Sequence, residues 1–166
     1  MSVQFVSIIS RQDKPLYIQS FIKSDGDSFD EQQTNQFLKF NFLSHMALDI
    51  ITSPSSINLR EQQQQFHESQ AGIDKQPPIY LLLFIQDSIS VYGYETSNGI
   101  KFIIGLKYLS STAELNDLFS QIHKCYLRTI CNPFNNVNEL TDQENLLNSP
   151  TFDSRVENIV SKFNKQ

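Results

Sequence analysis

His45 and Asp49 are the first pair in the chain whose side chains could act together. They stand four residues apart, a spacing that brings an imidazole and a carboxylate together on one face of a helix. Acid/base catalysis would also need a nucleophile or a third ligand. The sequence contains neither a G-x-S-x-G elbow nor an H-E-x-x-H zinc helix. The pair therefore indicates a surface, capping or interface contact rather than catalysis.

His123 and Cys125 form the second candidate pair, but they are two residues apart and so point to different faces of a helix. Zinc needs about four such ligands in a tetrahedral array, and no C-x-x-C or paired histidine accompanies them. We expect a buried Cys125 and an exposed His123. A small hydrolase using His45 or Cys125 stays an alternative, which the reactivity of the Cys125 thiol would test.

No loop of the sequence has the pattern of a cation or phosphate site. Acidic residues cluster at 25–31, but the glycine there directly follows the first aspartate, whereas an EF-hand loop has its glycine at position 6. Gly93, Gly99 and Gly105 do not follow the phosphate-loop pattern G-x-x-x-x-G-K-[ST]. We expect a solvated acidic loop, turn and packing roles for the glycines, and neither a cofactor nor a metal.

Alternating β-branched and aromatic residues predict the strands that would carry these residues. A hairpin comes first, with Pro15 opening its second strand because proline has no N–H to donate to the sheet. Three closely spaced strands then form an antiparallel meander. Residues 79–85 are apolar on both faces, so we expect both faces to be covered. The strands are predicted at residues 3–10, 16–18, 79–85, 89–94 and 100–106.

Apolar residues at helical spacing predict three helices. Polar loops are predicted before the first helix, after it and before the last helix, at residues 24–36, 53–78 and 135–149. The second helix, 112–130, ends at Asn132-Pro133. The third follows Ser149 and Pro150, an N-cap and a first helical residue. We expect Phe134, just after the second helix, to pack into the core.

The first helix, 38–52, carries more apolar surface than one buried face needs. Leu38 and Phe42 lie near the far edge of its apolar arc, next to a polar strip that includes His45 and Asp49. Either the helix is deeply buried or part of it contacts a partner. The rest of the arc consists of Phe40, Leu43, Met46, Ala47, Leu48, Ile50 and Ile51.

Composition excludes several function classes. The chain of 166 residues has a net charge of −5 and thirteen scattered basic residues, which argues against nucleic-acid binding. Its longest apolar run is far shorter than the roughly 20 residues that span a bilayer. The two cysteines are six residues apart, about 9 Å along a helix, and are expected to be free thiols. Without a recognisable leader or lipidation motif, we expect a single domain, 1–166, in the cytoplasm.

The order ββαβββαα indicates an α+β layered domain. Several segments then give the chain a family resemblance. These are Pro15-Leu16-Tyr17-Ile18, the stretch from Leu38-Lys39-Phe40 through His45-Met46-Ala47-Leu48-Asp49-Ile50, Val91-Tyr92-Gly93-Tyr94 with Thr96-Ser97-Asn98, Ile100-Lys101-Phe102, and Cys131-Asn132-Pro133-Phe134-Asn135. In this order and spacing the chain resembles the sedlin family of the transport protein particle (TRAPP) complex. It is most similar to the sedlin-like branch associated with assembly of the larger complex.

The resemblance implies a longin-like (SNARE-like, profilin-like) fold, a five-stranded antiparallel sheet with one helix on one face and two on the other. It also implies a non-catalytic subunit or assembly factor of the TRAPP vesicle-tethering and Rab guanine-nucleotide-exchange complex, acting in ER–Golgi and intra-Golgi or endosomal traffic. The implied partners are longin-like and Bet3-like TRAPP subunits and, indirectly, Rab GTPases. The implied location is the cytoplasm, with peripheral association to Golgi or endosomal membranes through the complex.

Physical pattern and resemblance together suggest that Leu38, Phe42, His45 and Asp49 border a subunit interface. Another longin-type trafficking module, either a SNARE regulatory domain or a small adaptor subunit, stays open as an alternative. A SNARE would need a heptad segment after the domain, and we expect none because the sequence ends at Gln166.

Overall fold

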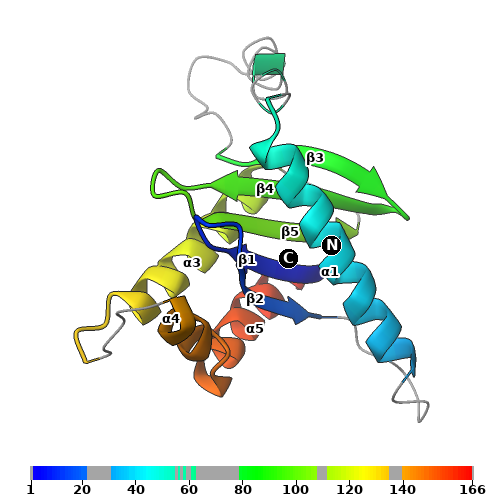
Figure 1. The fold of residues 1–166 in the computed structure, drawn as a ribbon. Helices are drawn as coiled ribbons and strands as arrows, with labels where there is room; N and C mark the ends of the chain where they lie inside the picture. Colours follow the sequence, from blue (N-terminus) through cyan, green and yellow to red (C-terminus); the bar gives the residue numbers. More distant parts are fainter. Residues whose placement is uncertain are drawn as a thin grey trace.

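The computed structural model describes residues 2–21, 31–54, 56, 58, 61–62, 79–107, 112–134 and 140–165. Its architecture is α+β, with one sheet between two layers of helices (Figure 1). The strands are β1 (Ser2–Ile9), β2 (Pro15–Ser20), β3 (Leu81–Gln86), β4 (Ile89–Glu95) and β5 (Lys101–Lys107). The helices are α1 (Glu31–Thr52), α3 (Thr112–Ile130), α4 (Leu140–Leu147) and α5 (Pro150–Asn164).

The five strands form one antiparallel sheet in the order β2-β1-β5-β4-β3, which confirms the predicted hairpin and meander. Pro15 opens the edge strand β2, as predicted. Strand β3 starts two residues later than expected. The Ile79 backbone N–H donates to Asn116 Oδ1 of α3 at 3.0 Å, so at this point the chain is bonded to a helix rather than to a neighbouring strand.

Each face of the sheet carries its own apolar core. On one face, α1 packs against residues from β1, β3, β4 and β5. On the other, α3, α4 and α5 cover the sheet. The predicted one-helix and two-helix layers are therefore present, and the short α4 joins the second layer. The expected cover on both faces of β3 is incomplete, because Ile85, at the sheet edge, is 64% exposed.

All three predicted loops contain helical residues, which in the loop 53–78 are residues 56, 58, 61 and 62. Residues 31–36 of the predicted loop 24–36 belong to α1, because Glu and Gln are good helix formers even where no apolar stripe marks the helix. Residues 140–147 of the predicted loop 135–149 form α4, whose Leu147 is fully buried. The acidic cluster, apart from the backbone of Glu31, and the glutamine run of the loop 53–78, apart from Gln62, lie outside the described residues.

Helices α3 and α5 follow their predicted patterns closely. Helix α3 has the expected bounds. Ser149 caps α5 by accepting a hydrogen bond from the Phe152 backbone N–H, with Pro150 in the first turn. The residues that both helices bury against the sheet are Leu115, Leu118, Phe119, Ile122, Tyr126, Phe152, Val156, Val160 and Phe163.

Candidate protein-interaction surface on helix α1

Helix α1 is held to the sheet by an apolar stripe and one buried polar contact. The ring of Phe40 stacks on that of Phe5 with centroids 5.0 Å apart. Beside this stack, the Ser44 hydroxyl donates to Ser7 Oγ of β1 at 2.8 Å, so both buried hydroxyls are satisfied. These contacts fix the rotation of the helix about its own axis. The residues that α1 buries are Phe40, Leu43, Ser44, Ala47, Leu48 and Ile51.

The opposite side of α1 carries all four residues predicted to border an interface. Leu38, Phe42, His45 and Asp49 recur at i, i+4, i+7 and i+11, so they form one row along the helix. All four are exposed; Leu38 is 60% exposed and Phe42 is 57% exposed. The structure therefore places the predicted residues together on the surface that faces away from the sheet.

Phe37 lies outside this row but adds a further exposed apolar side chain at the N-terminal end of α1, and the sequence analysis missed it. Its spacing from Phe40 and Ser44 places it in the buried stripe of the helix, yet it is 45% exposed. In Figure 1 the N-terminal end of α1 projects beyond the sheet, so this part of the stripe has no strand beneath it. The first buried residue of the described part of α1 is Phe40. The sequence would have indicated Phe37 only if the predicted helix had been extended back to Glu31, because Phe37 then lies inside the helix.

We call Phe37, Leu38, Phe42, His45 and Asp49 the α1 outer surface. Its chemistry is mainly apolar at the N-terminal end and polar towards the C-terminal end. Among the ion pairs of the described residues, none joins His45 to Asp49. The local contacts at Asp49 are made by its backbone carbonyl, which accepts from Ser53 N–H and from the Thr52 hydroxyl. The Asp49 carboxylate is therefore not used as a helix cap.

A surface ion pair lies beside the α1 outer surface. Lys39 Nζ is 2.9 Å from Asp87 Oδ2 in the turn between β3 and β4, with both side chains partly exposed. Exposed pairs of this kind contribute about 0–1 kcal/mol. Its role is thus to orient the two charges rather than to hold the helix.

The second predicted pair is separated as expected, with one correction. Cys125 is buried, and burial raises the pKa of its thiol. His123 is half-buried rather than exposed, because its ring lies 5.3 Å from that of Phe102 and 5.7 Å from that of Tyr94. This burial lowers the pKa of His123. Among the described residues, neither His123 nor Cys125 has the neighbours that would make it a catalytic base or nucleophile.

The prediction that Phe134 packs into the core is wrong, since its side chain is 92% exposed. Its backbone N–H donates to Asn132 Oδ1 at 3.2 Å, which closes a turn after α3 and directs the ring outwards. Within the described part of the chain, no group of three or more His, Cys, Asp or Glu side chains could hold a metal ion. In the same residues, no helix combines the length and apolarity required to cross a membrane.

Comparison with known proteins places this geometry in a family. The family model described as Sedlin matches residues 8–162. The chain belongs to the sedlin family. The sheet between two layers of helices, with the predicted ββαβββαα order and the short α4 added to it, is thus the longin-like α+β arrangement that the resemblance implied.

Curated sedlin relatives match over most of both chains. The trafficking protein particle complex subunit 2-like protein of Bos taurus is 28% identical over 79% of this chain and 81% of its own length. The protein of the same name from Taeniopygia guttata is 26% identical over 93% of this chain and 94% of its own length. The TRAPP-associated protein TCA17 of Saccharomyces cerevisiae is 29% identical over 78% of this chain and 77% of its own length.

Proposed function

We propose that this sedlin-family chain is a non-catalytic subunit or assembly factor of a TRAPP complex and acts in vesicle traffic through contacts between subunits. The names of its relatives support this role. Matches spanning 77% to 94% of the relatives' own lengths support carrying over the role of a whole protein. Its direct partners are longin-like or Bet3-like subunits, and its link to Rab GTPases and their nucleotide exchange is indirect.

The proposed place of action is the cytoplasmic side of Golgi or endosomal membranes, in ER–Golgi and intra-Golgi or endosomal traffic. The chain would reach the membrane peripherally, through the other subunits. This part of the proposal rests on the sedlin family and the relatives' names.

The observation that carries the proposal is the α1 outer surface. A large aromatic side chain exposes about 200 Å², so the 57% exposure of Phe42 corresponds to roughly 110 Å². At about 25 cal/mol per Å², burying this area stabilises a complex by about 3 kcal/mol. Ordering of the side chain costs about 0.5–1.5 kcal/mol. The net gain of about 1.5–2.5 kcal/mol is that of an interface anchor.

Phe37 and Leu38 lie close enough along α1 to be buried with Phe42 by the same partner. Apolar anchors next to the polar His45 and Asp49 have the composition of an interface core with its rim. Because Phe40, Leu43 and Ser44 hold the helix from the opposite side, the α1 outer surface is available without any change in the fold.

The test is affinity purification from native cytosol with the tagged chain and a double variant, Leu38→Ala with Phe42→Ala. Alanine is the best helix former, so the variant keeps α1. A matched control removes one leucine and one phenylalanine elsewhere, Leu127→Ala with Phe134→Ala, both on exposed side chains. Circular dichroism and thermal unfolding establish that all three proteins are folded alike.

We expect the wild type and the control to recover TRAPP subunits in equal yield. The α1 variant should recover at least about tenfold less, from the 1.5–2.5 kcal/mol estimated for Phe42 alone. Recovery of no TRAPP subunit by the wild type would refute the function. Recovery of SNAREs or coat adaptors instead would favour another longin-type module. Equal recovery by the α1 variant would refute the assignment of the surface while leaving the function.

A further inference from the structure

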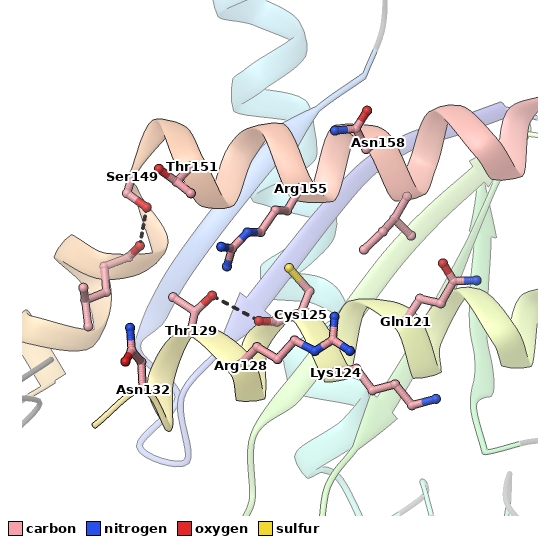
Figure 2. A pocket seen from close by; sticks show the side chains of 12 residues that line it. Gln121, Lys124, Cys125, Arg128, Thr129, Asn132, Ser149, Thr151, Arg155 and Asn158 are labelled. Carbon is pink, nitrogen blue, oxygen red and sulfur yellow. Dashed lines mark hydrogen bonds between the residues drawn. The ribbon is translucent and has the colours of Figure 1, made fainter. Parts of the chain in front are cut away.

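A groove of about 700 Å³ runs between α3 and α5, on the layer of helices opposite α1. Figure 2 shows its side chains, which come from α3, from α5 and from the junction of α4 with α5. Ligand pockets typically have volumes of about 300–1,000 Å³, so the groove has room for a small molecule. Its lining is formed by Gln121, Lys124, Cys125, Arg128, Thr129, Asn132, Leu146, Ser149, Thr151, Arg155, Asn158 and Ile159.

In the part of the chain that the structure describes, three cations and no carboxylate line the groove. Lys124 and Arg128 are four residues apart on α3, and Arg155 reaches towards them from α5 (Figure 2). This is an unusual gathering in a chain whose net charge is −5. Among the described residues, the ion pairs involve other lysines, and none includes these three cations. Asp117, an acid on α3 that does not line the groove, accepts a hydrogen bond from Gln121 Nε2 at 2.6 Å.

The arrangement of charges costs stability in the absence of an anion. Like charges at i and i+4 on a helix, as at Lys124 and Arg128, are destabilising. Arg155 adds a third positive charge from the facing helix. An anionic ligand would remove this repulsion, and a guanidinium presents the planar fork that pairs with two phosphate oxygens at once.

The floor of the groove is compatible with an anion. Cys125 lies there, and its burial raises the pKa of the thiol, an effect larger than the opposing effect of Arg155 and Arg128. The sulfur therefore stays a neutral thiol near pH 7 and does not repel a phosphate. At the end of α3, Asn132 Oδ1 is bonded to the Phe134 N–H, which leaves the Nδ2 group as the donor of that side chain.

We propose that this groove binds the phosphate groups of a small phosphorylated molecule, of which an inositol polyphosphate is the test case. Three cations match the charge of a few phosphates. They are too few for a nucleic acid, whose backbone requires an extended basic surface. The phosphates could be presented by a free inositol phosphate or by a lipid headgroup, and the experiment separates these two sources.

Calorimetric titration of the whole chain with inositol 1,4,5-trisphosphate at low salt is the first measurement. The variant is Arg128→Gln with Arg155→Gln. The matched control, Lys162→Gln with Lys165→Gln, removes the same two charges from exposed positions at the end of α5. We expect the groove variant to bind at least about tenfold more weakly, as for loss of charged hydrogen bonds. The control should stay within about twofold, and added salt should weaken wild-type binding.

Flotation with phosphatidylcholine vesicles, with and without phosphatidylinositol 4,5-bisphosphate, is the second measurement. Flotation that requires the phosphoinositide identifies a lipid headgroup as the ligand. Binding in the calorimetric titration without flotation identifies a free inositol phosphate as the ligand. Either result supports the proposal. Absence of binding in both measurements overturns it, as does equal weakening by the groove and control variants. Tighter binding of a polyglutamate peptide than of the trisphosphate also overturns it, because the groove would then recognise an acidic protein.

Discussion

Gly105 of β5 lies against Phe5, the β1 ring that stacks on Phe40 of α1, and substituting it tests how the helix is held. A Cβ added to Gly105 would lie within van der Waals contact distance of three ring atoms of Phe5, the nearest of them Cε1. Carbon atoms normally approach to about 3.5–4.0 Å, so the ring must move by more than 1 Å. Phe5 is fully buried and stacked on Phe40 of α1. The displacement therefore passes to the helix.

The expected cost of Gly105→Ala follows from these contacts. Overpacking of a rigid buried ring costs about 3 kcal/mol, the upper part of the usual range. Replacing glycine by alanine recovers about 0.4–1 kcal/mol through the unfolded chain, because the φ of Gly105 is not positive. The net loss in the free energy of unfolding is about 2–2.5 kcal/mol, which corresponds to a fall in Tm of roughly 4–10 °C.

Gly93→Ala is the matched control on the neighbouring strand. Its added Cβ would be 2.8 Å from Ile51 Cδ1 and 2.9 Å from Leu83 Cδ1. Both are methyl groups at the ends of flexible side chains that can turn aside. We expect a change of less than about 1 kcal/mol, so the two glycines should differ clearly.

Urea unfolding followed by circular dichroism measures both variants, and the double variant Phe5→Leu with Gly105→Ala completes a cycle. If the ring is the obstacle, the double variant is at least about 1 kcal/mol more stable than the sum of its single changes predicts. Equal stability of the Gly105 and Gly93 variants, or strict additivity in the cycle, would refute the reasoning.

Three further outcomes follow from burial. A thiol reagent should label the exposed Cys131 rapidly and the buried Cys125 only slowly, as mass spectrometry of the folded protein would show. Burial raises the pKa of Tyr80 to about 12. The shift contributes stability to the folded state that is fully present below about pH 10 and is lost as the pH rises to about 12. Tyr80→Phe should therefore flatten the fall in urea stability over that range. Burial lowers the pKa of His123, so its contribution is present above about pH 6.5 and is lost as the pH falls below that value. His123→Asn should reduce acid sensitivity more than His45→Asn does, and equal acid profiles would contradict this.

Local pattern was sufficient to predict most of the fold. The 3.6-residue spacing of Leu115, Leu118 and Ile122 predicted α3 with its observed bounds. The cap chemistry of Ser149 and Pro150 predicted the start of α5. The pattern was insufficient for α4 and for the first turns of α1, because these segments bury little apolar surface, and burial is what produces a periodic signal.

The candidate interface was only partly predictable from the spacing of residues along the chain. Leu38, Phe42, His45 and Asp49 share a helix face by spacing alone, whatever that helix packs on. The exposure of Phe37 depends on where the sheet ends beneath α1. The exposure of Phe134 depends on the turn closed by Asn132. Neither relation is visible in the spacing of the residues.

By itself the sequence determined the order of the five strands and the three longer helices, the apolar excess of the first helix and the resemblance to the sedlin family, because these properties are local or additive along the chain. The tertiary structure alone decided that Phe37 and Phe134 are exposed and that Lys124, Arg128 and Arg155 line one groove. Lys124 and Arg128 share a helix face through their spacing. Arg155 joins them only because α5 packs against α3, and the distance between residues on different helices is set by packing, which no local pattern encodes.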